Sequence, residues 1–158
     1  MSKLTKIGFV VESLGPNQLA YQLIRSANQL LMERDDFDII LYYRNLSPLV
    51  MKPNFAIMNM YEAFRPDSPL VATDLNTATR ILDYFTLDRY FYIWDLEHTK
   101  MNRSYEDFAQ IYQNPKLKLI TRSKQHFDII QLTWGITPIG IVEDARIEKF
   151  LELINAGK

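Results

Sequence analysis

Two carboxylates and a histidine follow a strongly apolar run in this sequence. The run is Tyr90 to Trp94, and Asp95, Glu97 and His98 come directly after it. If the extended backbone continues past the run, Asp95 and Glu97 point to one side and His98 to the other. Paired carboxylates on one side can divide the roles of general acid and general base, or share a metal ion. We therefore predict Asp95, Glu97 and His98 as catalytic candidates.

A metal ion at these carboxylates would need a third ligand. The sequence has 2 histidines and no cysteine, so His126 is the other imidazole that could serve. His126 falls near the start of a predicted helix, where exposure to solvent is the simpler interpretation. The lack of cysteine also removes thiolate catalysis, disulfides and the common structural zinc sites. We therefore predict no metal ion.

The loop after the first apolar run reads GPNQLA and holds one glycine, Gly15. A dinucleotide-binding loop needs three glycines, and a phosphate-binding loop ends in Gly-Lys-Ser or Gly-Lys-Thr. A serine hydrolase carries its nucleophile in Gly-x-Ser-x-Gly. None of these motifs occurs in the sequence. We expect no cofactor, and neither an ordinary nucleoside triphosphatase nor a serine hydrolase.

Strand-like and helix-like segments alternate along the chain. Runs of β-branched and aromatic residues predict strands at residues 6–12, 37–43, 55–60, 70–73, 89–95, 117–121 and 138–142. Apolar residues spaced three and four apart predict helices at residues 18–33, 76–85, 124–134 and 145–155, and a short helix after Ser104. Residues 44–70, rich in Pro, Asn and Met, predict an irregular excursion.

Strands that alternate with helices in this way are typical of a three-layer α/β/α sandwich. The pattern predicts a Rossmann-like fold with a mostly parallel sheet of six or seven strands. Neither a repeat nor a linker divides the sequence, and 158 residues suit one hydrophobic core. We predict a single domain over residues 1–158.

Ligands of an open parallel sheet bind at the carboxyl ends of its strands, so the polar residues there are candidates. We predict ligand-binding roles for Gly15, Asn17, Asp74, Arg122, Ser123, Glu143 and Asp144. Four of them also stand where helix caps are expected: Asn17, Asp74 (with Asn76 as the alternative for the same helix), Ser123 and Asp144. A cap stabilises a helix by about 1 kcal/mol with no ligand present, so both interpretations stay open.

Charge and hydropathy narrow the class of partner. The sequence has 18 basic and 19 acidic residues and a formal charge of -1, which gives no overall field to attract nucleic acid. No apolar stretch approaches the length of a membrane-spanning helix, and residues 1–10 lack the features of a signal peptide. We expect a cytoplasmic protein that binds neither membrane nor nucleic acid.

Five segments carry a resemblance to a known family. They read IGFVVESLGPNQLAYQLI, VATDLNTATRIL, YFYIWDLEH, LKLITRSKQHFDII and GITPIGIVED, and together they span most of the chain. In this order they resemble the amino-terminal half of two-domain glycosyltransferases with the B-type fold. The resemblance is greatest to glycosyltransferase-like proteins of T-even-like tailed phages.

The resemblance implies that this half holds the sugar acceptor, while a second Rossmann-like domain binds the nucleotide sugar. Residues 15–17 would then face the cleft, and residues 95–98 would line the acceptor pocket. The sequence ends at Lys158, where the second domain of the family would begin. We expect a sugar or nucleotide-sugar ligand and weak or no transfer by this chain alone, in the host cytoplasm if a phage encodes it.

Two other interpretations stay open. One is a non-catalytic interaction or structural accessory protein that keeps the fold as a scaffold and binds a protein partner or a second copy of itself. Its contact surface, if exposed rather than packed in the core, would be Val50, Met51, Met58, Met60 and Tyr61. The other is a small enzyme for a nucleotide or sugar phosphate that uses Asp95 and Glu97.

Overall fold

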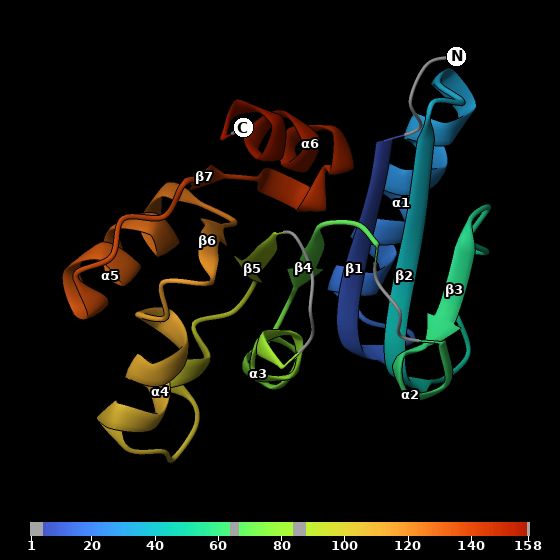
Figure 1. Ribbon diagram of the computed structural model, residues 1–158. Coiled ribbons are helices and arrows are strands. Elements are labelled where there is room, and N and C mark those ends of the chain that lie inside the picture. Colours follow the sequence, from blue (N-terminus) through green and yellow to red (C-terminus); the bar gives the residue numbers. More distant parts are fainter. Residues whose placement is uncertain (1–4, 64–66, 84–87, 158) are drawn as a thin grey trace.

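The computed structural model describes residues 5–63, 67–83 and 88–157. These residues form one seven-stranded sheet in which every neighbouring pair of strands is parallel, with helices on both faces (Figure 1). The predicted α/β sandwich with a mostly parallel sheet is therefore confirmed. Residues 64–66 of the predicted excursion and residues 84 and 85 of the second predicted helix lie outside the described residues.

The strands are rich in β-branched and aromatic residues, which suits a sheet that is covered on both faces. They are β1 (Thr5–Leu14), β2 (Phe37–Leu46), β3 (Ala56–Asn59), β4 (Leu70–Ala72), β5 (Arg89–Ile93), β6 (Lys118–Thr121) and β7 (Gly140–Ile141). Their order across the sheet is β3-β2-β1-β4-β5-β6-β7. The chain builds outward from β1 to β3, returns to the other side of β1, and builds outward again from β4 to β7. The direction thus reverses between β1 and β4.

Four of the helices begin at a side-chain cap that the sequence predicts. The helices are α1 (Gln18–Glu33), α2 (Met60–Ala63), α3 (Leu75–Leu82), α4 (Tyr105–Tyr112), α5 (Lys124–Trp134) and α6 (Ile147–Ala156), with 3₁₀ turns η1 (Glu97–Thr99) and η2 (Glu143–Ala145). The predicted caps Asn17, Asp74, Ser104 and Ser123 accept hydrogen bonds from the first turns of α1, α3, α4 and α5. No helix in the described ranges is both long and apolar enough to cross a membrane.

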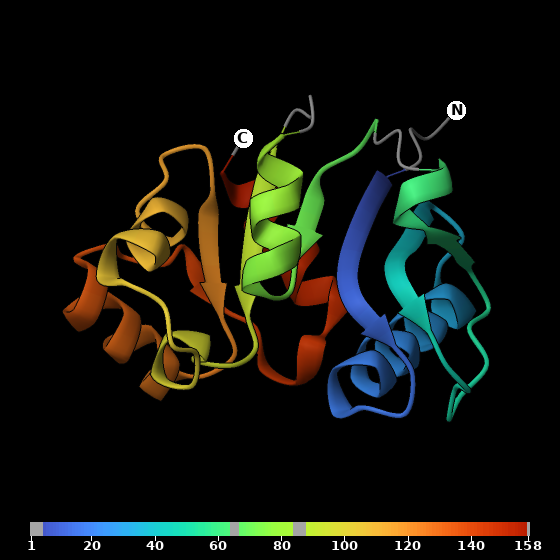
Figure 2. The same cartoon turned by 90° about the horizontal axis from the view of Figure 1, so that it is seen from below.

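Two hydrophobic cores lie on opposite faces of the sheet. One contains residues of α1 and α6, and the other contains residues of α3, α4 and α5. Figure 1 shows α6 returning across the sheet toward α1, and Figure 2 shows α3 and α4 in front of it. Along β5, Tyr90 and Tyr92 enter the first core, whereas Phe91 and Ile93 enter the second. Because all four are 1% exposed or less, these four side chains are core and their rings are not available to a ligand.

The fifth strand ends earlier than predicted. It stops at Ile93, which pairs with Thr121 at the last position of β6. Beyond it the Trp94 N–H turns back to the Tyr92 carbonyl at 3.0 Å, and the 3₁₀ turn η1 follows. The prediction of a strand through Asp95 was therefore wrong, because no neighbouring strand continues to pair with it.

The last helix begins at a different residue and with a different cap than predicted. Asp144 and Ala145 have φ angles of 53° and 51°, so they are not helical, and α6 begins at Ile147. The Ile147 N–H donates to Ser26 Oγ at 2.8 Å. The predicted cap at Asp144 was wrong, because a serine of the neighbouring helix α1 takes that role.

The segment predicted to be irregular contains β3 and the short helix α2. Met60 is 1% exposed, and Met51 and Met58 pack against the two cores. Val50 and Tyr61 are 68% and 55% exposed. Met60 is therefore a core residue and Met51 and Met58 are partly buried against the cores, so the suggested contact surface is reduced to its two exposed members.

Candidate functional site

A crevice of about 420 Å³ lies where the strand order reverses, at the carboxyl ends of β1, β4 and β5. In an open parallel sheet, the loops diverge at this point and leave room for a ligand. The polar side chains that line the crevice include Glu12, Ser13, Asn17, Asp74, Asp95 and Glu97. The structure thus brings together four of the predicted site residues, Asn17, Asp74, Asp95 and Glu97.

The crevice is acidic, because four carboxylates line it. Arg44 pairs with Glu12 at 2.7 Å, and Lys100 approaches Asp95 at 3.6 Å. Both pairs are partly exposed, so each contributes little to stability, but each cation still offsets one carboxylate charge. In the described part of the chain, Asp74 and Glu97 make no ion pair.

Asp74 is held rigidly as the amino-terminal cap of α3. Its Oδ1 accepts from the Thr77 N–H at 2.8 Å, while Thr77 Oγ1 accepts from the Asp74 N–H at 3.2 Å. This reciprocal pair is a capping box. Burial raises the pKa of the Asp74 carboxyl, and the Thr77 hydrogen bonds act in the opposite direction. Its structural role is therefore clear, and the same carboxyl also forms part of the crevice wall.

Glu97 is the crevice residue best suited to proton transfer. Its Oε1 accepts a hydrogen bond of 2.9 Å from the N–H of Leu75, the first residue of α3. Burial is the largest of the causes that raise the pKa of Glu97 to about 7, and the charges of Asp74 and Asp95 add to it. The Leu75 N–H opposes this rise. A carboxyl that titrates near neutral pH can both accept and return a proton.

His98 lies on the other side of the same 3₁₀ turn, away from the crevice. Its ring is 6.3, 5.6 and 5.4 Å from the rings of Phe108, Tyr112 and Trp134. Its Nδ1 is buried with no hydrogen-bond partner among the described residues. Burial lowers the pKa of the imidazole. The structure therefore separates His98 from Asp95 and Glu97, although the three are nearly adjacent in sequence.

Arg122 and Ser123 lie beside the crevice rather than in its lining. The Arg122 guanidinium stacks 4.1 Å from the centre of the Trp94 ring and donates to the Trp94 carbonyl at 3.3 Å. Ser123 Oγ accepts from the His126 N–H at 3.1 Å as the cap of α5. Both side chains thus have structural partners in the absence of any ligand.

Gly15 also has a packing explanation. A side-chain carbon at this position would collide with the Ser47 hydroxyl, which packs against the loop between β1 and α1. The Ser47 N–H donates to the Leu14 carbonyl at 3.0 Å and holds the two segments together. The small residue therefore allows this contact, whether or not a ligand approaches.

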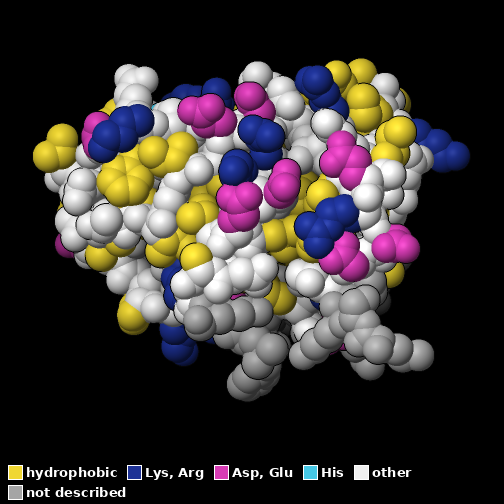
Figure 3. Space-filling view, turned by 90° about the horizontal axis from the view of Figure 1, so that it is seen from above, with side chains coloured by type: hydrophobic (Ala, Val, Ile, Leu, Met, Phe, Trp, Pro, Cys, Tyr) yellow, Lys and Arg dark blue, Asp and Glu magenta, His cyan; other side chains and the backbone are white. Residues whose placement is uncertain are grey.

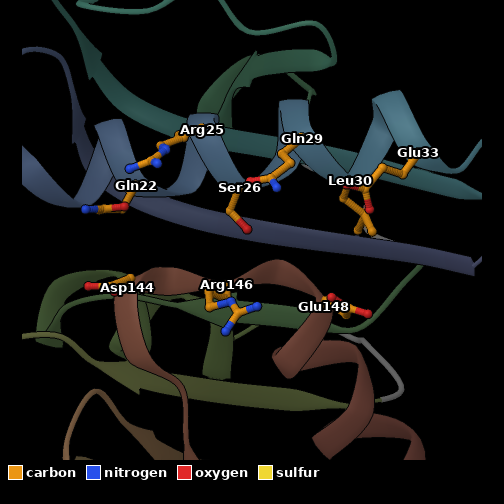
Figure 4. Close-up of a pocket in the computed structure, with 9 residues that line it drawn as sticks. All are labelled: Gln22, Arg25, Ser26, Gln29, Leu30, Glu33, Asp144, Arg146 and Glu148. Carbon is orange, nitrogen blue, oxygen red and sulfur yellow. The ribbon is translucent and has the colours of Figure 1, made fainter.

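Asp144 belongs to a second groove, of about 360 Å³, between α1 and the segment of η2 and α6 (Figure 4). Figure 4 shows Ser26 pointing from α1 toward the opposite wall. Arg25 and Arg146 face this groove together with Glu33 and Glu148, and Figure 3 shows basic and acidic side chains intermingled on this face. A lining of mixed charge favours neither an anionic nor a cationic ligand. Glu143 is exposed on η2, so neither predicted residue of this turn lines the crevice.

Glu12 is a crevice residue that was not among the candidates. It follows the apolar part of β1 just as Asp95 follows that of β5, so the same rule could have selected it. In the described ranges, no group of three or more His, Cys, Asp or Glu residues is arranged to hold a metal ion.

Comparisons of the chain with protein-family models, with curated proteins and with solved structures found no match. The relationship to glycosyltransferases therefore stays a prediction from the sequence.

Proposed function

We propose that this chain is the acceptor-binding domain of a B-fold glycosyltransferase-like protein, with weak or no sugar transfer on its own. In this proposal the crevice holds a sugar or another hydroxyl-bearing acceptor, and Glu97 accepts the proton of the reacting hydroxyl. The observation that carries the proposal is a carboxyl group with a pKa of about 7 in a crevice at the reversal of strand order.

The acidic lining supports a neutral acceptor rather than a phosphate. Carboxylates accept hydrogen bonds from sugar hydroxyls, whereas they repel the charges of a diphosphate. Asp74 and Glu97, which make no ion pair among the described residues, would therefore disfavour a nucleotide sugar in this crevice. A nucleotide-sugar site would have to be supplied by another domain or chain, which is why we expect little transfer by these residues alone.

The proposed chemistry needs one proton acceptor in this half. The acceptor oxygen forms a bond to the anomeric carbon of the donor sugar, and its proton passes to the Glu97 carboxylate. The bond between the anomeric carbon and the phosphate oxygen breaks, and the nucleoside diphosphate leaves with the electron pair. A base with a pKa near the operating pH is the most effective for such a step.

Calorimetric titration at pH 8 tests the proposal. The probes are glucose, galactose, N-acetylglucosamine and maltose as neutral saccharides, and UDP-glucose as a nucleotide sugar. We expect saturable heat for at least one neutral saccharide, with affinity reduced about tenfold or more in Glu97→Gln, because a lost charged hydrogen bond costs about 1.5–3 kcal/mol. Glu106→Gln, an exposed glutamate of α4, is the matched control and should bind as the wild type does. The absence of heat with all neutral saccharides would contradict the proposal.

A non-catalytic interaction protein is the second candidate. Three large apolar side chains are exposed: Leu46 at the end of β2 (51%), Val50 in the connection that follows it (68%) and Tyr61 on α2 (55%). Exposed apolar side chains of this size can bind a protein partner. Light scattering combined with size-exclusion chromatography tests self-association, and a strictly monomeric protein that captures no partner would count against this candidate.

A further inference from the structure

We propose that His98 is a positioning residue, which uses its anchor among the aromatic rings of α4 and α5 to hold the Glu97 carboxylate at the crevice. This inference rests on the proposed function, because it takes Glu97 as the proton acceptor. It changes the role of His98, which does not touch the crevice, from a candidate catalytic group to the support of its neighbour.

The anchor is a contact of one imidazole with three rings. The planes of Phe108, Tyr112 and Trp134 lie at 74°, 84° and 84° to the plane of His98. Tyr112 and Trp134 stack on each other at 5.0 Å and are only 1% and 4% exposed. Because these partners come from two helices and are themselves fixed in the core, His98 has little freedom to change its rotamer.

A short hydrogen-bonded turn transmits this restraint to Glu97. The N–H groups of Lys100 and Met101 both donate to the Glu97 carbonyl at 2.9 Å. Thr99 donates to the Leu96 carbonyl through its N–H at 3.0 Å and through its hydroxyl at 2.7 Å. These hydrogen bonds hold the backbone of η1 in one conformation. Fixing the His98 side chain on one side of the turn therefore also fixes the direction in which the Glu97 side chain points on the other side.

Glu97 needs such support, because its side chain has three rotatable bonds and can adopt other rotamers in which the carboxylate is hydrated. The single described contact that holds its carboxylate in place is the bond from the Leu75 N–H at 2.9 Å. If the turn relaxed, the carboxylate would leave α3 for water and lose the burial that raises its pKa. The anchor of His98 would then set the proton affinity of a group that it does not contact.

A purely structural role for His98 makes a different prediction. If the imidazole only fills space between α4 and α5, truncating it lowers the stability of the fold and leaves the titration of Glu97 unchanged. If it positions Glu97, truncation lowers the pKa of Glu97 even in molecules that stay folded. The pKa of the Glu97 carboxyl in the ligand-free protein therefore separates the two roles.

The experiment follows the side-chain carboxyl carbons of ¹³C-labelled glutamate by NMR from pH 4 to pH 9. In the wild-type protein we expect Glu97 to titrate at about 7. In His98→Ala we expect a value of about 5.5 or lower, toward the ordinary 4.5. His98→Phe keeps a ring in the aromatic cluster and should restore the wild-type value. His126→Ala removes the other half-buried imidazole and should leave Glu97 unchanged.

A folded His98→Ala protein in which Glu97 still titrates near 7 would overturn the proposal. If His98→Ala does not fold, Phe108→Leu removes one wall of the anchor, and an unchanged Glu97 titration there would overturn it equally. No ligand is present in these titrations. Saccharide binding with an unchanged titration would reject the positioning role alone, and a shifted titration without saccharide binding would reject the proposed function alone.

Discussion

The Oε1 atom of Glu97 accepts a hydrogen bond of 2.9 Å from the backbone N–H of Leu75. This contact joins the turn after β5 to the first residue of α3, beside the crevice. A helix amino terminus favours the ionised carboxylate, whereas burial favours the protonated acid. Burial is the larger effect here, which leaves Glu97 with a pKa near neutral pH.

Glu97→Gln should remove a pH dependence of stability. The pKa of Glu97 rises from 4.5 to about 7 on folding, so its contribution to stability is complete below pH 4.5 and is lost as the pH rises through 7. Relative to Glu97→Gln, the wild-type protein should lose about 1–2 kcal/mol between pH 4.5 and pH 8, a figure reduced for partial exposure to water. Urea unfolding at pH 4.5, 6 and 8 measures this, and a constant difference between the two proteins would show that Glu97 titrates normally.

The contribution of His98 to stability should depend on pH in the opposite sense to that of Glu97, and at lower pH. Burial lowers its pKa below the ordinary 6.5, so its contribution to stability is present above pH 6.5 and is lost as the pH falls. His98→Phe should therefore become more stable relative to the wild type as the pH decreases from 7 to 5. The same urea series measures this difference.

His126→Gln should also become more stable relative to the wild type as the pH falls, because burial lowers the pKa of His126 as well. It removes the second imidazole and leaves that of His98 in place. If only His126→Gln gains stability relative to the wild type as the pH falls, and His98→Phe does not, the loss of stability in acid comes from His126 and the prediction for His98 is contradicted.

Ser26→Ala should weaken the docking of α6 on α1. The Ser26 hydroxyl accepts from the first N–H of α6 at 2.8 Å, and the loss of a helix cap costs about 1 kcal/mol. Asp144→Gly tests the cap that the sequence predicted, at a position with a φ angle of 53°. Because glycine adopts positive φ without strain, this variant should be as stable as the wild type or more so. If urea unfolding shows that both variants lose the same stability, the assignment of Ser26 as the cap of α6 is contradicted.

Arg122→Ala should expose the ring of Trp94. The guanidinium lies 4.1 Å from the ring centre, and such a contact stabilises by about 0.5–1 kcal/mol. In a Trp134→Phe background, where Trp94 is the one tryptophan left, we expect its fluorescence to shift to longer wavelength. Lys124→Ala is the control, since Lys124 stacks on Phe127 instead. An unchanged emission in Arg122→Ala would contradict the stacking.

Much of the fold was predictable, because the signals that define it are local. The predicted limits of α1 and α5 agree with the structure, as do the caps Asn17 and Ser123. Apolar periodicity and a cap together mark such elements within a few residues of sequence. The end of β5 was not predictable in this way, since a strand continues only while a neighbour pairs with it.

The site was predictable as an edge of the sheet but not as a set of contacts. The alternation of elements indicates a parallel sheet whose carboxyl edge binds ligands, whereas the reversal of strand order that brings β1, β4 and β5 together is known only from the structure. The separation of His98 from Glu97 depends on a 3₁₀ turn and on rings from α4 and α5. The Ser26 cap joins residues 121 positions apart, and no local pattern carries that information.

The central claim is that the acidic crevice binds a neutral, hydroxyl-bearing acceptor. The most direct measurement is a ¹H–¹⁵N NMR titration at pH 8 with glucose, galactose, N-acetylglucosamine, maltose and UDP-glucose. We predict saturable shifts of the Asp74, Leu75 and Asp95 amides with at least one neutral saccharide, and their loss in Glu97→Gln. If none of these amides moves with any neutral saccharide, or if they move only with UDP-glucose, the claim is contradicted.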